Sequence, residues 1–426
     1  MKMKKILLST ALCALMGGTA YVAGSTDAKA AGFYIQEQSV SGLGTAFAGS
    51  TTSIRDASTI YFNPAGMTRL DGAQANLGVH LLLPNGDLDD TGTTNPGPNP
   101  VSTGNGGNPY SASPVPNAYI AMPLTDMLWG GLGISAPFGL ANEYDDGYFG
   151  RFDSTETSLI TINISPVVAY QATPWLSIGG GLDIQYADAE LKSAISDTIA
   201  EGESKLEGDD VSMGFNLGLL VTPREGTDIG FSYRNGINHE LDGNISVTGL
   251  SGLVPTAPNF SVGGSADLDL PDIWTLGVAQ DLNDKWRVMG QITRFGWSDF
   301  EDITAISDAG TVISTVEQGY QNTWALAIGA EYEWNPEWTF RAGYQFDETP
   351  TTSEFRTTRT PDGDRHWFTA GATYDINEKF SVDMAGAYID VGDETISVSR
   401  NGGLSQVEAD TSGNVGILSL GLNYKF

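Results

Sequence analysis

The chain closes with Leu418-Ser419-Leu420-Gly421-Leu422-Asn423-Tyr424-Lys425-Phe426, in which a large apolar residue stands at every second position. Successive side chains of a β-strand point to opposite faces, so one face of this stretch would be apolar and the other small or polar. A tilted strand of about ten residues crosses a bilayer. The stretch therefore predicts a wall strand of a transmembrane β-barrel, with its apolar face toward lipid.

The same alternation recurs through most of the chain after residue 70. Residues 162–170, 216–221 and 324–332 repeat it, and short turns alternate with long stretches rich in Asp, Gly, Thr and Ser. Several short turns lead into an aromatic ring, which suits the interfacial girdle of a membrane barrel. Six short turns and seven long loops would join fourteen strands, predicted at 72–84, 114–123, 128–138, 157–171, 175–190, 210–222, 227–240, 266–281, 285–298, 316–334, 338–347, 364–375, 379–390 and 414–426. We therefore predict an all-β fold, a fourteen-stranded antiparallel transmembrane β-barrel over residues 72–426, with both ends on the periplasmic side.

Residues 1–30 have the pattern of a cleavable leader. Lysines at the start precede an apolar run from Ile6 to Gly18, and small residues stand at Ala28 and Ala30. The run is too short to span a bilayer. We predict a secretory signal peptide over residues 1–30, cut near Ala30/Ala31. The single cysteine, Cys13, lies in this leader, which excludes disulfides and thiolate metal sites from the remainder.

Charge and composition exclude further classes of protein. The formal net charge is −31, and so acidic a chain repels nucleic acid phosphates. No segment after the leader reaches about 18 consecutive apolar residues, which excludes transmembrane helices. The Asp-rich stretches Gly86–Asp90 and Gly208–Asp210 lack the spacing of an EF-hand, which leaves open calcium binding or an acidic surface that meets lipopolysaccharide through divalent ions. We expect no cofactor, no metal site and a monomer.

Residues 31–71 lie outside the predicted wall, because they show little sustained alternation. Fourteen strands enclose a lumen that side chains alone do not fill. The segment would therefore either plug the lumen or extend as disordered chain into the periplasm, and the residues alone leave both alternatives open. At the third predicted strand, Gly133, Pro137 and Gly139 would permit a kink, since glycine accepts unusual dihedrals and proline removes a ladder donor; otherwise Pro137 merely ends the strand.

Short motifs distributed along the whole chain, in order, resemble the FadL family of long-chain fatty acid transporters. Each is weak alone, and together they are specific. They are Ala31-Gly32-Phe33, Ser41-Gly42-Leu43-Gly44-Thr45-Ala46, Asn63-Pro64-Ala65, Ala136-Pro137-Phe138-Gly139-Leu140, Leu270-Pro271-Asp272-Ile273-Trp274, Pro361-Asp362-Gly363-Asp364-Arg365-His366-Trp367 and the terminal Phe426.

The resemblance implies an N-terminal hatch over residues 31–71 inside a fourteen-stranded barrel, and a route for hydrophobic cargo. Capture would occur between loops at roughly Glu190–Asp210 and Glu240–Ala266, followed by transfer to a deeper pocket beside the N-terminus. Movement of the hatch would then open a lateral path at the kink in the third strand, with Asn63-Pro64-Ala65 opposite it. The ligand-binding or gating residues implied are Gly32, Phe33, Tyr34, Asn63, Pro64, Ala65, Gly133, Pro137, Phe138, Gly139 and Lys192.

The implied cargo is a long-chain fatty acid, whose carboxylate needs a cation; the basic candidates near the loops are Lys192, Lys205 and Arg151. The loops are otherwise acidic, which leaves neutral aromatic hydrocarbons as an alternative cargo. A water-filled general porin is a further alternative. An outer-membrane hydrolase is disfavoured, because the chain has 3 histidines and no serine in a G-x-S-x-G context. We predict that the protein is not an enzyme and has no catalytic residues.

Overall fold

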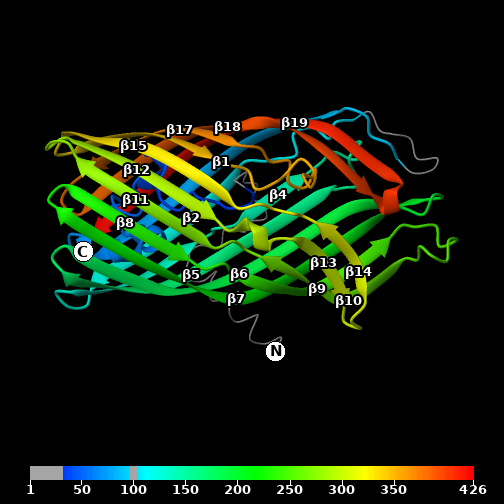
Figure 1. Cartoon of the computed structure of the whole chain (residues 1–426), viewed down its shortest axis with the longest axis horizontal. Coiled ribbons are helices and arrows are strands. Elements are labelled where there is room, and N and C mark those ends of the chain that lie inside the picture. The colour runs from blue at the N-terminus through cyan, green and yellow to red at the C-terminus, as the bar shows by residue number, and fades with distance from the viewer. Residues whose placement is uncertain (1–31, 96–103) are drawn as a thin grey trace.

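The computed structural model describes residues 32–95 and 104–426 (Figure 1). The predicted signal peptide and its cleavage point lie outside these residues. Strands make up most of the described chain. They are β1 (Gln74–Asp90), β2 (Ser113–Pro123), β3 (Leu128–Ser135), β4 (Gly139–Glu143), β5 (Glu156–Thr173), β6 (Leu176–Ser196), β7 (Glu201–Arg224), β8 (Thr227–Arg234), β9 (Asn238–Thr248), β10 (Phe260–Asp269), β11 (Ile273–Asp281), β12 (Trp286–Phe295), β13 (Asp302–Ser307), β14 (Val312–Glu317), β15 (Thr323–Asn335), β16 (Trp338–Asp347), β17 (Arg365–Asp375), β18 (Phe380–Arg400) and β19 (Ser405–Lys425). The helices are short: α2 (Val40–Leu43), α3 (Thr59–Phe62), and the 3-10 turns η1 (Pro64–Arg69), η2 (Trp297–Asp299) and η3 (Asn401–Gly403).

The strands form one antiparallel sheet that closes on itself, because β1 pairs with β19 from Gln74↔Lys425 to Asp90↔Ala409. In five places two consecutive segments continue each other across a break: β3/β4, β8/β9, β10/β11, β12/β13 and β14/β15. Counted in this way, the wall is a closed barrel of 14 strands, which confirms the predicted fold class and strand number. Short turns join the strands at one end of the barrel and longer excursions at the other; we call these the short-turn end and the hairpin end.

The alternation read from the sequence matches the two faces of the wall. Leu418 and Leu420 are 61% and 55% exposed on the outside, whereas Ser419 between them is buried and bonds to Nδ1 of His80 over 2.7 Å. The outward apolar side chains have no protein partner and suit contact with lipid. No helix in the described residues is long and apolar enough to cross a bilayer.

Four of the predicted long loops, at residues 190–210, 240–266, 298–316 and 390–414, are instead largely continuations of the wall. β6 and β7 remain paired as far as Ser196↔Glu201, and β18 and β19 as far as Arg400↔Ser405. The prediction was wrong there because the outward faces of these extensions are polar or charged rather than apolar, although the alternation persists. Leu191 points inward, and the next residue, Lys192, pairs with carboxylates on the other face.

Residues 32–71, which we call the N-terminal segment, pack against the inner face of the wall. Val40, Leu43, Phe47, Ile60 and Met67 share one buried cluster with inward side chains of the wall. The segment touches widely separated strands: its contacts include Gly131 of β3, Gly230 of β8, Gly343 of β16 and Gly371 of β17. It therefore occupies the lumen, and Figure 1 shows it as the blue chain among the strands.

Candidate functional site

The wall is interrupted at its third strand, between Ser135 and Gly139. β3 pairs with β2 and β5, whereas β4 pairs with β5 alone, and no register in the described residues joins β4 to β2. The N-terminal segment bonds to the interrupted stretch. The Ile35 N–H donates to the carbonyl of Pro137 over 2.8 Å, and the Gly139 N–H donates to the carbonyl of Phe33 over 2.9 Å. Tyr34 and Phe138 form an isolated antiparallel bridge between these two bonds.

The glycines beside the break provide space, which differs from the role that the sequence suggested. Neither Gly133 nor Gly139 has a positive φ. A Cβ on Gly139 would lie 2.8 Å from Cδ1 of Ile35, and one on Gly133 would lie 3.1 Å from Cγ2 of Ile60. These positions lack a side chain because the N-terminal segment approaches the wall closely there.

Asn63-Pro64-Ala65 lies against β6 and β7, whereas residues 33–38 contact the break. Asn63 caps η1 by accepting the Ala65 N–H over 3.1 Å, and its Nδ2 donates to the carbonyls of Thr51 (2.8 Å) and Leu219 (3.1 Å). Gly179 and Gly218 make room for this contact, since a Cβ on either would strike the motif within 3.0 Å. The motif therefore fixes the far side of the N-terminal segment to the wall.

An apolar pocket opens on the inner face toward the hairpin end. It contains about 670 Å³ of space free of protein atoms, including the part open to solvent. Most of its lining is aliphatic or aromatic, with Phe33 of the N-terminal segment at one side. The other apolar lining residues are Leu140, Leu159, Ala189, Leu191, Leu206, Leu241, Ala266, Leu268, Phe300, Ile303 and Tyr320.

Phe33 joins the pocket to an aromatic cluster that holds the start of the N-terminal segment. Its ring meets Trp297, Phe300 and Phe138 edge to face, with centroids 4.7, 5.4 and 6.2 Å away. Edge-to-face pairs add about 0.5–1.5 kcal/mol each beyond the burial of area. Phe33 is thus both pocket lining and anchor, so a molecule that displaces its ring also weakens the anchor.

Arg359 lines the pocket from the loop between β16 and β17, residues 348–364, which folds inward and is largely buried. Its Nη1 donates to the Glu156 carbonyl (3.1 Å) and Thr157 Oγ1 (3.0 Å), and its Nη2 to the carbonyls of Asp153 (3.1 Å) and Lys192 (3.2 Å). In the described residues no carboxylate forms an ion pair with it. Removal from water lowers the pKa of Arg359, against the negative charge of Asp153, which raises it.

The basic residues singled out from the sequence lie elsewhere. Lys192 is on the outer face of β6 and is not part of the pocket lining; its Nζ contacts Glu156 (2.5 Å) and Glu190 (2.7 Å). Arg151 pairs with Glu201 over 2.8 Å. Arg359 was missed because its loop was read as an exposed polar excursion. Residues 349–360 are rich in Thr and Arg, a polar composition that gave no sign of their burial.

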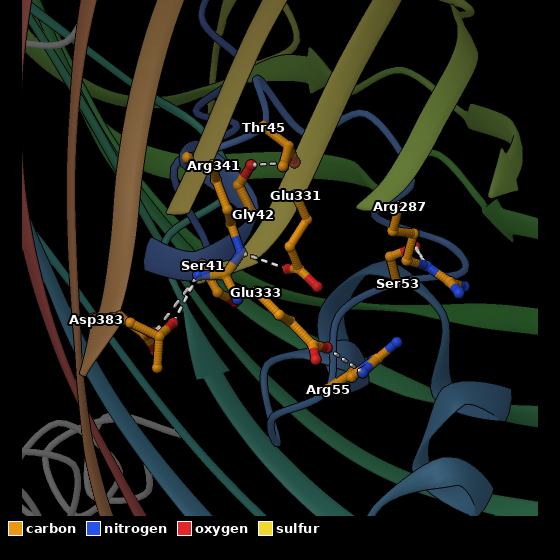
Figure 2. Close-up of polar contacts among 12 residues, drawn as sticks. Ser41, Gly42, Thr45, Ser53, Arg55, Arg287, Glu331, Glu333, Arg341 and Asp383 are labelled. Carbon is orange, nitrogen blue, oxygen red and sulfur yellow. Dashed lines mark hydrogen bonds and ion pairs between the residues drawn. The ribbon is translucent and has the colours of Figure 1, made fainter. Parts of the chain in front are cut away.

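A second, polar cavity lies below the N-terminal segment at the short-turn end, where its lining includes Asn335 and Pro336. Figure 2 shows Arg341 between Glu331 and Asp383, with Nε–Oε2 and Nη1–Oδ1 separations of 2.8 and 4.0 Å. Arg55 of the segment reaches Glu333 over 3.7 Å. Ion pairs and water-accessible carboxylates line this cavity, so it does not continue the apolar pocket toward the short-turn end.

Comparison with known proteins identifies the family. A family model described as outer membrane protein transport protein (OMPP1/FadL/TodX) matches residues 21–426. The chain belongs to this family. It is 27% identical over 434 residues to a long-chain fatty acid transport protein of Escherichia coli, covering 94% of this chain and 96% of that protein. It is 28% identical to outer membrane protein P1 of Haemophilus influenzae over the full length of both.

Solved structures agree with this FadL-family assignment. The crystal structure of a Pseudomonas aeruginosa FadL homologue matches with a TM-score of 0.88 at 25% identity, covering 93% of this chain and 100% of that one. The Pseudomonas putida toluene transporter TodX matches in fold, with a TM-score of 0.69 at 20% identity, covering 90% and 98%. The protein is thus an outer-membrane transport protein, as the motifs and the barrel indicated.

Proposed function

We propose that this protein carries long-chain fatty acids across the outer membrane, with capture at the hairpin end, gating by the N-terminal segment as a hatch, and lateral release at the break in the third strand. The curated relatives named as fatty acid transport proteins support the cargo. The observation that carries the proposal is the apolar pocket lined by one guanidinium, that of Arg359, which is partly buried and forms no ion pair with a carboxylate of the described residues.

The pocket matches the chemistry of a fatty acid at both ends. Each CH₂ that leaves water gains about 0.8 kcal/mol, so a long alkyl chain favours the leucine-lined volume over solution. A carboxylate gains about 1.5–3 kcal/mol from a hydrogen bond to a charged donor. Arg359 donates hydrogen bonds only to uncharged oxygens, and the carboxylate of Asp153, whose charge favours the protonated form of Arg359, bonds to Arg400 and Thr358 instead. A ligand carboxylate would therefore form a direct ion pair that Arg359 lacks among the described residues.

The surroundings of the N-terminal segment support lateral release of the cargo through the wall. Below the segment, the cavity lined by Arg341, Glu331 and Asp383 is polar, and an alkyl chain would lose the advantage of burial there. At its other side, residues 33–35 cover the break between β3 and β4, beyond which lies the lipid-facing surface. Withdrawal of these residues would give the cargo an apolar route into the membrane.

The test compares binding and uptake of oleate, methyl oleate and toluene by the wild-type protein and Arg359→Met. We expect oleate affinity to fall by about 10–100-fold in the variant, because one charge-assisted contact is lost, and methyl oleate affinity to change little. Lys192→Met is the matched control, since Lys192 carries the same charge on the outer face, and it should bind oleate as the wild type does. Uptake of toluene with exclusion of oleate would contradict the fatty acid assignment and favour aromatic hydrocarbons.

A further inference from the structure

Gln38 occupies an unusual position at the break in the third strand. Its side chain is fully buried. It lies four residues after Tyr34, which forms the bridge to Phe138. The Ala136 N–H donates to Gln38 Oε1 over 3.2 Å, and Gln38 Nε2 donates to the Ala136 carbonyl over 2.8 Å. One carboxamide thus satisfies both backbone groups of Ala136, as a residue of a neighbouring strand would.

The orientation of this carboxamide is set by its partners. Nε2 has a second acceptor, the carbonyl of Ile35, over 3.2 Å, while Oε1 accepts from the Ala136 amide and from no other donor in the part of the chain that the structure describes. A flipped amide would place two donors together at Ala136, so a single orientation fits. The Gln38 backbone is fixed as well, because Tyr119 of β2 donates its hydroxyl to the Gln38 carbonyl over 2.9 Å.

The contacts of Gln38 therefore span the interruption. Tyr119 belongs to β2 on one side, and Ala136 belongs to the linker between β3 and β4, where strand pairing to β2 has ended. A buried backbone N–H and carbonyl without partners are costly, above all beside lipid, where water cannot replace the bond. With the segment withdrawn, Ala136 would lose both of these bonds at once.

We propose that Gln38 is a positioning residue that seals the wall, by supplying through its side chain the ladder hydrogen bonds that the break removes. This inference rests on the proposed function only for its consequence in transport; the seal itself is a statement about the closed state. Release of the segment by cargo would then break the bonds of Gln38 and those of residues 33–35 together, which makes opening of the wall cooperative.

The chain offers a matched control two residues away. Gln36 is also buried, and it exchanges side-chain hydrogen bonds with Gln345 of β16, with Gln345 Nε2 donating over 2.8 Å. Gln36→Met and Gln38→Met remove the same chemistry from the same segment. Of these two side chains, that of Gln38 bonds to the linker between β3 and β4, whereas that of Gln36 bonds to β16. General loosening of the segment would therefore affect both variants, whereas loss of the seal would affect Gln38→Met alone.

The experiment measures amide hydrogen exchange of residues 135–139 and oleate binding and uptake in the full-length protein. We expect Gln38→Met to speed exchange at the break by about tenfold relative to Gln36→Met, to change oleate uptake at least threefold, and to leave oleate affinity within twofold. Equal exchange at the break in the two variants would overturn the seal. Faster exchange in Gln38→Met with unchanged uptake would support the seal. It would instead contradict the proposed function, in which cargo leaves through the break.

Discussion

The backbone N–H of Gly32 donates to Oδ2 of Asp362 over 2.9 Å, although 330 positions separate the two residues. Asp362 lies in the inward-folded loop 348–364, where it also accepts from Thr349 Oγ1 (2.7 Å) and binds Arg365. The same loop carries Arg359, which lines the apolar pocket. The loop 348–364 thus both lines the pocket and holds the start of the N-terminal segment. A ligand that shifts Arg359 would therefore also disturb the contact between Asp362 and Gly32.

Replacement of Asp362 should loosen the N-terminal segment. In Asp362→Asn the charge that holds Gly32 and Arg365 is lost, and hydrogen bonds to charged groups contribute about 1.5–3 kcal/mol. We expect amides 33–38 to exchange at least tenfold faster by hydrogen-exchange mass spectrometry. Asp364→Asn is the control, because Asp364 lies in the same loop and accepts the Thr349 N–H over 2.9 Å without touching the segment. Equal exchange in the two variants would contradict the anchor.

The wall was predictable from sequence because its two faces meet different surroundings. The outer face suits lipid and needs apolar side chains, whereas the inner face packs in the lumen and takes small or polar ones. Leu418 and its neighbours had to alternate, and the fourteen strands followed. Arg359 and Gln38 were not predictable, because each acts through contacts made by residues more than ninety positions away. Lys192 shows the limit of spacing arguments: a shift of one position along β6 separates the pocket lining at Leu191 from the outer face.

Two wall glycines give a direct test of where the N-terminal segment rests. A Cβ on Gly343 of β16 would lie 2.1 Å from the backbone carbon of Thr45, whereas one on Gly290 of β12 would meet nothing nearer than 3.9 Å. We expect Gly343→Ala to displace residues 44–46 and to expose the segment to added protease, while the barrel itself remains folded in heat-modifiability gels. Gly290→Ala should behave as the wild type. Full protease resistance of Gly343→Ala would argue against this contact.

The docking of the segment should weaken as the pH rises. Burial raises the pKa of Glu37 from 4.5 to about 7, against the backbone N–H groups of Glu37 and Gln36 and the attraction of Arg365, which lower it. The charge of Glu37 also adds to the rise in the pKa of Tyr34, which is caused mainly by burial. The docked state therefore binds the proton more tightly than the undocked state, in which the carboxyl returns to its ordinary value.

It follows that docking is fully stabilised below pH 4.5 and loses stability up to about pH 7, by about 1.4 kcal/mol per unit. Protection factors of amides 33–38, which divide out the intrinsic pH dependence of exchange, should fall across this range and then level off. Glu37→Gln should remove the dependence. If the protection factors fell by the same amount in Glu37→Gln, the pH dependence would belong to another titratable group.

We propose that the N-terminal segment must leave the break before cargo passes. Tyr34 and Phe138 are a non-hydrogen-bonded pair of an antiparallel bridge. In such pairs the two Cα atoms are about 4.5 Å apart, which is within the range that a disulfide spans. Residues 32–426 contain no cysteine, so Tyr34→Cys/Phe138→Cys would place one defined pair across the break. The measurement is oleate uptake by cells carrying this variant, before and after reduction. We predict no uptake while the disulfide is closed and its recovery on adding reductant; uptake at the same rate in both states would contradict the account.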